Sequence, residues 1–113
     1  MLETAGATGA RKAAAEYGHH GIRVNVVTPG WTRAPHTNER LDVRDEALLL
    51  DSTPLRELVE PRDIADAVAW LVGEDSRHVT GADVVVDGGA HLIGGAAALR
   101  TTYRHRLGMP PHG

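Results

Sequence analysis

The sequence contains no cysteine, no phenylalanine and a single lysine among its 113 residues. The absence of cysteine excludes disulfides, thiolate metal sites and cysteine nucleophiles. Aromatic residues are limited to two tryptophans and two tyrosines, so a core must rest on Val, Leu, Ile and Ala. No stretch reaches the roughly 18 consecutive apolar residues of a membrane span, and the first residues lack the apolar run of a signal peptide. We therefore expect a cytoplasmic protein that has no membrane partner.

The charge is mildly acidic, with 12 basic and 15 acidic residues and a formal net charge of −3. This balance gives no electrostatic basis for binding nucleic acid. The length suits one domain with a modest core. From residue 94 onward the composition turns to Gly, Ala and Arg without any acid. We expect residues 1–93 to form the domain and residues 94–113 to be a partly disordered tail.

The first half of the chain predicts a helix, a strand and a long irregular segment. The helix is expected over residues 3–17, where "ARKAAAEY" consists of strong helix formers and a glycine follows. The run "IRVNVVT" predicts a strand over residues 22–28. Residues 31–55 are polar and irregular, with apolar residues that suggest one or two short helices. Long segments of this kind are often functional, so we expect a mobile flap here.

The second half predicts a helix and a second strand. The helix is expected to begin at Pro61 and to end before Gly73. Trp70 is assigned to its core-facing side, and the spacing i, i+4, i+7, i+8 predicts a buried stripe of Ile64, Val68, Leu71 and Val72. A run of three valines predicts a strand over residues 82–87 that is buried on both faces, as in parallel sheets. The order of elements predicts an α/β fold with parallel strands.

Metal and hydrolytic chemistry does not assemble from the remaining residues. The seven histidines show neither H-x-x-x-H nor H-E-x-x-H spacing, so we assign no metal ligand. Ser52 and Ser76 lack a nucleophile elbow or a recognisable base partner. Asp63 and Asp66 fall at the start of the predicted helix, where carboxylates compensate the helix dipole. We interpret the histidines as surface or loop residues and the two aspartates as part of the helix start.

Three ordered blocks, "GIRVNVVTPGW", "PLRELVEPRDIADAVAWLV" and "VTGADVVVDGG", resemble the short-chain dehydrogenase/reductase family in its NAD(P)-dependent oxidoreductase members. That family folds as a Rossmann-like, doubly wound parallel sheet. The resemblance covers residues 21–89 and implies the C-terminal part of this sheet: sixth strand, substrate flap, helix and last strand. It also implies that the opening helix is the family's long helix that follows the catalytic Tyr and Lys.

The loop after the first predicted strand is the candidate cofactor contact. Ligands of open α/β sheets bind beyond the carboxyl ends of the strands, and a Pro-Gly pair follows this strand. Glycine permits close approach, and exposed peptide groups can hydrogen-bond a carboxamide. In the family this loop contacts the nicotinamide of NAD or NADP, which the resemblance assigns to Pro29, Gly30, Trp31 and Thr32. A threonine that contacts the cofactor in the family is replaced here by Ala34.

The family's catalytic residues have no counterpart in the sequence. There is no glycine-rich turn after a strand. Tyr17 and Tyr103 are followed four residues later by Gly21 and Leu107, so neither forms the Tyr-x-x-x-Lys pair that exchanges a proton during hydride transfer. We assign no catalytic residue. The hypothesis is a C-terminal fragment of an alcohol/ketone oxidoreductase, similar to 3-oxoacyl reductases, that is inactive alone.

Two alternatives stay open. The chain can be a non-catalytic interaction module or pseudoenzyme that forms a homo-oligomer or pairs with a full-length subunit of the same family. In that family the matched opening helix and last strand take part in subunit contacts. The chain can also be a truncated gene product without independent function. Half of a Rossmann sheet leaves strand edges without neighbours, so we expect marginal stability.

Overall fold

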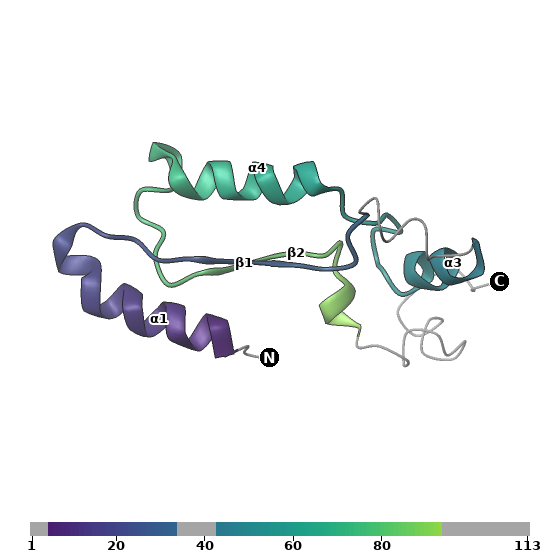
Figure 1. Cartoon of the computed structure of the whole chain (residues 1–113), viewed down its shortest axis with the longest axis horizontal. Helices are drawn as coiled ribbons and strands as arrows, with labels where there is room; N and C mark the ends of the chain where they lie inside the picture. Colours follow the sequence, from purple (N-terminus) through teal and green to yellow (C-terminus); the bar gives the residue numbers. More distant parts are fainter. Residues whose placement is uncertain (1–4, 34–42, 94–113) are drawn as a thin grey trace. The chain divides into compact units, whose positions relative to one another are not determined.

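A computed structural model describes residues 5–33 and 43–93 of the chain (Figure 1). The predicted tail 94–113 and Ala34 therefore lie outside the described residues. The described residues divide into two compact units, one within residues 5–28 and 62–85 and the other within residues 29–33, 43–61 and 86–93. The elements are α1 (Ala5–Tyr17), β1 (Val26–Pro29), α3 (Val43–Asp51), α4 (Pro61–Val72) and β2 (Asp83–Val86), with 3-10 turns at Gly18–His20, Glu74–Ser76 and Ala90–Leu92.

Strands β1 and β2 pair in a two-stranded parallel sheet. The N–H of Val26 donates to the carbonyl of Ala82 at 2.9 Å, and the N–H of Gly30 donates to that of Val86 at 3.0 Å. Both strands are shorter than the predicted 22–28 and 82–87. At the start of the first run, the N–H of Val24 donates to the Thr80 hydroxyl and its carbonyl accepts the N–H of Gly81, so this end is bound to a turn rather than to β2.

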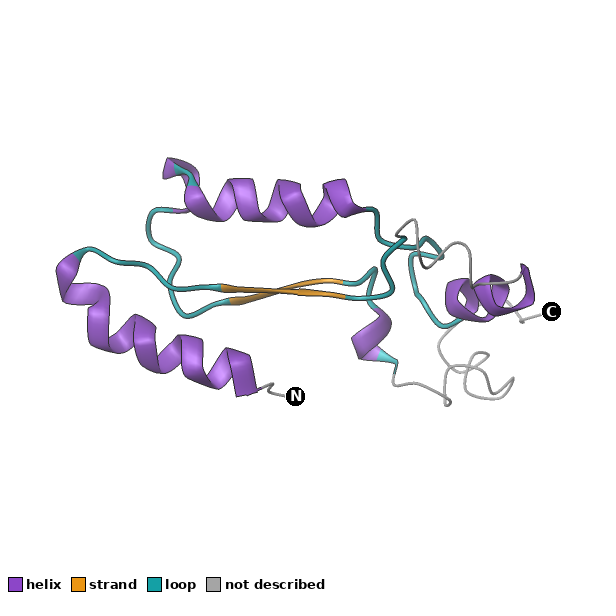
Figure 2. Cartoon of the chain, in the orientation of Figure 1, coloured by secondary structure: helices purple, strands orange, loops and turns teal. Residues whose placement is uncertain are grey.

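The first unit has helices on both faces of the strand pair: α1 lies on one face and α4 on the other (Figure 2). Helix α1 buries Ala7 and Ala14, which lie two turns apart on one side. Gly81 has a positive φ of 74° and packs against Ala14. Because Gly81 has no side chain and Ala14 has only a methyl group, the two backbones can approach closely. Small residues thus bring this helix near the strands. None of the described helices is both long and apolar enough to cross a membrane.

Arg23 fixes the C-terminal end of α4. Its Nη2 donates to the carbonyls of Leu71 at 2.6 Å and Gly73 at 3.3 Å, and its Nη1 donates to the carbonyl of Val79 at 3.0 Å. The carbonyl of Leu71 lies in the last turn of α4 and has no partner within the helix, and a cation near a helix C-terminus is electrostatically favourable. The helix begins at Pro61 and stops before Gly73, which confirms both predicted boundaries.

The predicted burial of α4 and of β2 is wrong in part. Leu71 is buried, but Val68 is 43% exposed, Val72 is 76% exposed and Trp70 is 47% exposed. The middle valine of β2, Val85, is also exposed, so the strand is not buried on both faces. A sheet of two strands is too narrow to cover a helix stripe and two strand faces.

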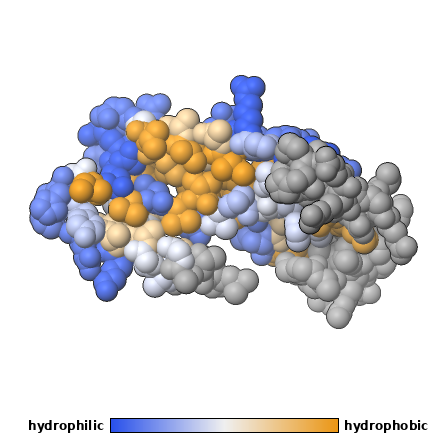
Figure 3. Space-filling view, in the orientation of Figure 1, coloured by the Kyte–Doolittle hydropathy of each residue, from blue (hydrophilic) through white to orange (hydrophobic). Residues whose placement is uncertain are grey.

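The uncovered stripe borders a groove of about 550 Å³ within the first unit. We call it the α4 groove. Figure 3 shows apolar atoms gathered over α4 and the strand region beside it. The lining comes from the segment that leads into β1 and from the last turns of α4: Gly21, Arg23, Val24, Asn25, Val27, Val68, Leu71 and Val72.

Candidate functional site

Pro29 is the last residue of β1, one residue beyond the predicted end of the strand, and Gly30, Trp31 and Thr32 follow it directly. The backbone of Gly30 lies directly against Asp87, which follows β2. A Cβ atom added to Gly30 would stand 2.5 Å from the Cβ of Asp87 and 2.8 Å from its Cα. Packing against a neighbouring strand end therefore demands glycine here, whether or not a ligand approaches.

A parallel bridge between Thr32 and Val59 sets the orientation of the loop. The N–H of Val59 donates to the carbonyl of Trp31 at 2.9 Å, and the N–H of Arg33 donates to the carbonyl of Val59 at 2.7 Å. In a parallel bridge of this pattern, the flanking residues make the hydrogen bonds, so the N–H and C=O of Thr32 point away from Val59. Thr32 thus presents one donor and one acceptor on the same edge.

The side chains of the loop divide between internal and outward roles. The Thr32 hydroxyl donates to the carbonyl of Gly30 at 3.0 Å, which closes the loop on itself. This use of the hydroxyl argues against Thr32 replacing the family threonine that is absent at Ala34, a position outside the described residues. The indole of Trp31 is 55% exposed. The loop therefore offers a ligand a peptide edge and an exposed aromatic ring.

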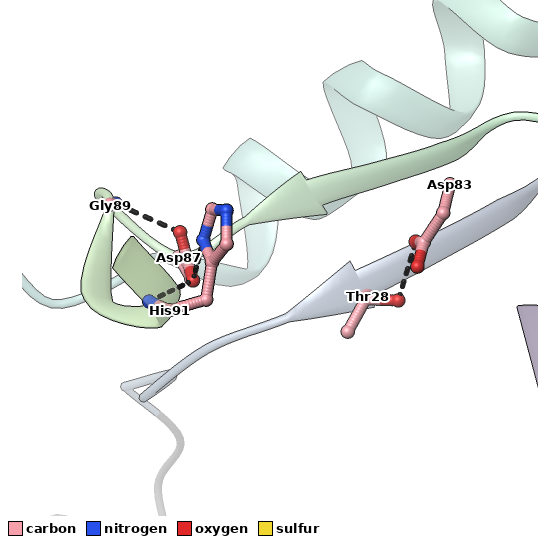
Figure 4. A network of polar contacts seen from close by, with 5 residues as sticks. All are labelled: Thr28, Asp83, Asp87, Gly89 and His91. Carbon is pink, nitrogen blue, oxygen red and sulfur yellow. Dashed lines mark hydrogen bonds and ion pairs between the residues drawn. The ribbon is translucent and has the colours of Figure 1, made fainter. Parts of the chain in front are cut away.

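Asp87 is a buried carboxylate with a full set of donors (Figure 4). One oxygen, Oδ1, accepts the N–H of Gly89 at 2.8 Å, while Oδ2 accepts the N–H of His91 at 2.9 Å and lies 2.7 Å from its Nδ1. Burial favours the neutral acid, but the backbone donors and the His91 ring together hold the pKa of Asp87 below its ordinary value. These three contacts hold the Asp87 carboxylate in one orientation.

The two glycines after Asp87 pack against the loop that follows α3. Gly88 and Gly89 have positive φ angles of 64° and 89°. A Cβ on Gly88 would stand 2.7 Å from Cγ2 of Thr53, and one on Gly89 would stand 3.0 Å from Cγ of Pro54. The N–H of Leu55 donates to the carbonyl of Gly88 at 3.0 Å. The sequence predicts only that the second strand ends at residue 87, and nothing in it indicates this packing role.

Arg33 is a further residue that sequence reasoning missed. Its Nη2 lies 2.6 Å from Oε1 of Glu46 on α3, and its Nε lies 3.2 Å from Oε1 of Glu60. The hydrogen bond to Glu46 and the charge of that carboxylate raise the pKa of Arg33, with a smaller contribution from Glu60. The partners are 13 and 27 residues away along the chain, so no local pattern indicates the contact.

Comparison with known proteins identifies the family. A family model described as enoyl-(acyl carrier protein) reductase matches residues 5–91. The chain belongs to the short-chain dehydrogenase/reductase family. It is similar to an A-factor type gamma-butyrolactone 1'-reductase of Streptomyces virginiae, with 47% identity over 82 residues. It is also similar to a (3R)-3-hydroxyacyl-CoA dehydrogenase of Mus musculus, with 44% identity over 81 residues.

These matches cover 71% of this chain in each case but only 32% and 30% of the relatives, so the chain spans about a third of their length. A structure of 4-hydroxyisoleucine dehydrogenase complexed with NADH matches at a TM-score of 0.72 and 28% identity, covering 76% of this chain and 36% of that one. A 3-oxoacyl-[acyl-carrier protein] reductase from Brucella melitensis ATCC 23457 matches at a TM-score of 0.70 and 34% identity, covering 74% and 31%. The predicted Rossmann-like class is confirmed, and the chain holds part of that fold.

Proposed function

We propose that the chain takes part in the NAD(P)-dependent oxidation or reduction of an alcohol or ketone, of the kind that 3-oxoacyl reductases carry out. Its contribution is the surface that holds the nicotinamide carboxamide, formed by Pro29, Gly30, Trp31 and Thr32. Family membership supports the reaction class. A structural neighbour described as complexed with NADH supports the cofactor class.

The observation that carries the proposal is the peptide edge of Thr32. A primary carboxamide has one carbonyl acceptor and one NH₂ donor. Thr32 offers the complementary N–H and C=O on the edge opposite Val59. Two hydrogen bonds to one ligand group fix its plane as well as its position. Gly30, held against Asp87, keeps the loop in place while these bonds form.

The remaining parts of such a reaction need residues that the sequence does not contain. Hydride transfer to a carbonyl requires a proton donor for the oxygen, which the family supplies with a Tyr-x-x-x-Lys pair. The pyrophosphate of the cofactor needs a glycine-rich turn at a helix N-terminus. Neither sequence pattern occurs among the 113 residues. We therefore expect no turnover from this chain alone, and a partial cofactor site that recognises the nicotinamide end.

Saturation-transfer NMR tests the proposal on the isolated 113-residue chain, with NADH, nicotinamide mononucleotide and ADP as separate probes. We expect saturation at the nicotinamide protons and little at adenine. Thr32→Pro removes the donating N–H and should abolish the nicotinamide signal, whereas the control Thr32→Ser retains it. Equal nicotinamide signals in both variants, or saturation at adenine alone, contradicts the proposed contact. Cofactor-dependent turnover by the isolated chain would contradict the expectation that the proton donor and the glycine-rich turn must come from another polypeptide.

A second candidate function, subunit association, is favoured by the α4 groove. Val27 lies both in this groove and on the outer edge of β1, because the ladder to β2 uses Val26 and Gly30. Within residues 5–33 and 43–93 no strand pairs with this edge of β1, and an edge beside exposed Val68 and Val72 is suited to accept a further strand. We propose a second copy of this chain as the occupant, with two β1 edges pairing antiparallel about a two-fold axis.

Sedimentation equilibrium tests this association. We expect a reversible dimer whose dissociation constant rises roughly tenfold or more in Val72→Asp, because a charge would be buried in the groove. Leu92→Asp is the matched control, since Leu92 is 74% exposed and lies outside the groove. A monomer at all concentrations, or equal effects of the two variants, contradicts the dimer. If the chain stays monomeric but binds a full-length subunit of the same family, that subunit is the occupant and the dimer is contradicted.

A further inference from the structure

Arg33 joins three segments of the second unit. Its backbone N–H donates to Val59, while its guanidinium contacts Glu60 through Nε and Glu46 through Nη2. Glu46 belongs to α3, and Glu60 immediately precedes Pro61, the first residue of α4. The residue that follows Thr32 along the chain is therefore the one that contacts α3.

Helix α3 is held differently at its two ends. Near its C-terminus the Thr53 hydroxyl donates to the carbonyl of Leu49 at 2.8 Å, and Arg56 pairs with the buried Asp51 at 3.0 Å. In the first half of the helix, Glu46 pairs with Arg33 at 2.6 Å. Leu48, two residues further along the helix, is 43% exposed. An ion pair made by the residue next to Thr32 is thus one of the contacts that hold α3.

We propose that Arg33 is a positioning residue that couples the Thr32 peptide to helix α3. The proposal deepens the proposed function, and its cofactor arm rests on that function. A carboxamide bound by the N–H and C=O of Thr32 restrains the backbone from which Arg33 extends. The restrained guanidinium then restrains Glu46, and α3 becomes more ordered. Because α3 lies within residues 31–55, the segment expected to form the substrate flap, occupancy of the loop is transmitted to the substrate side.

The geometry requires arginine at this position. The contacts leave the guanidinium from two different nitrogens, Nε toward Glu60 and Nη2 toward Glu46. A lysine carries the same charge on one flexible ammonium group and cannot reproduce this fork. Arg33→Lys is therefore a conservative variant that separates the positioning role from the charge.

Hydrogen exchange of the full chain, followed by mass spectrometry, tests the coupling. Without ligand, we expect Arg33→Lys to raise exchange in residues 43–51 by roughly two- to fivefold while residues 62–72 are unchanged. Arg62→Lys is the control. The side chain of Arg62 is 88% exposed and its Nε lies 3.8 Å from Oδ2 of Asp66, so the same substitution there changes only a weak surface pair. With NADH, we expect exchange in α3 to slow in the parent chain and not in Arg33→Lys. Equal slowing in both chains overturns the proposal.

A second arm needs no cofactor and remains decisive even when NADH does not bind, a result that would refute the proposed function alone. Thr32→Gly loosens the loop, and Glu46→Gln removes the carboxylate on α3 without changing its size. If the coupling passes through Arg33, Thr32→Gly raises α3 exchange in the parent chain but has little further effect beside Glu46→Gln. Simple additivity of the two substitutions overturns the coupling. Circular dichroism of each variant verifies that the helices remain formed.

Discussion

Replacing Gly30 by alanine places a methyl group where the chain has no room for one. The new Cβ would lie 2.5 Å from Cβ and 2.8 Å from Cα of Asp87. Comfortable carbon–carbon contacts are about 3.5–4.0 Å, so the two strand ends must separate by roughly 1 Å. Both crowded atoms of Asp87 lie on or next to the backbone, and its carboxylate is held by three contacts, so a rotamer change gives no relief.

The expected destabilisation is the sum of two unfavourable contributions and one favourable contribution. Overpacking costs about 1–3 kcal/mol. Separation of the strand ends weakens the hydrogen bond from Gly30 to Val86, which contributes about 1 kcal/mol. Removing a flexible glycine from the unfolded chain returns about 0.4–1 kcal/mol. We expect Gly30→Ala to lower the free energy of unfolding by about 2 kcal/mol, or Tm by roughly 8–16 °C for a domain of this size.

Urea denaturation followed by circular dichroism measures this change, with Gly9→Ala as the matched control. Gly9 lies within α1, and a Cβ there would meet nothing within 4 Å. The same substitution should therefore raise the free energy of unfolding by about 0.5–1 kcal/mol. If Gly30→Ala is neutral or stabilising, as Gly9→Ala is expected to be, the steric explanation of the Pro-Gly loop is refuted.

Two further predictions concern the turn after β2. Gly88→Ala should lower the free energy of unfolding by about 1–2 kcal/mol, because φ is 64° there and L-residues are strained in this region; an unchanged urea midpoint would contradict this. The pKa of Asp87 is depressed by folding, so its stabilisation is present above the ordinary pKa and is lost as pH falls through the lower folded value. Asp87→Asn should therefore flatten the acid limb of the stability profile measured by urea denaturation between acidic and neutral pH; a profile equal to that of the parent chain would count against the role of Asp87.

Local signals were enough to predict α4 and the site loop. Pro61 and Gly73 determine the helix ends through their own backbone properties, so the predicted bounds are confirmed. The Pro-Gly pair lies at the carboxyl end of β1 for an equally local reason. The strand lengths were overpredicted because Val24 is bound by the turn at Thr80 and Gly81, a contact from a distant part of the chain.

Burial and the supports of the site could not be predicted locally. The spacing of Val68 and Val72 indicates an apolar stripe correctly, but exposure depends on how many strands lie beneath it. The orientation of Thr32 likewise depends on its bridge to Val59. Arg33 and Glu46 belong to different segments, and no periodic pattern in the sequence predicts that these segments meet. Sequence reasoning located the loop, whereas tertiary contacts decide which groups it presents.

The bridge between Thr32 and Val59 makes the loop sensitive to insertions and deletions as well as to substitutions. Val59 contributes its backbone N–H and C=O to the bridge, and its buried side chain restricts the position to apolar residues of similar size. A shift of one residue along either segment would instead turn the peptide edge of Trp31 or Arg33 outward and that of Thr32 inward. The number of residues from β1 to Thr32, and from Val59 to the start of α4, thus determines which peptide edge faces outward. Within this family, length variation is expected to be tolerated inside the flap and excluded at its two anchored ends.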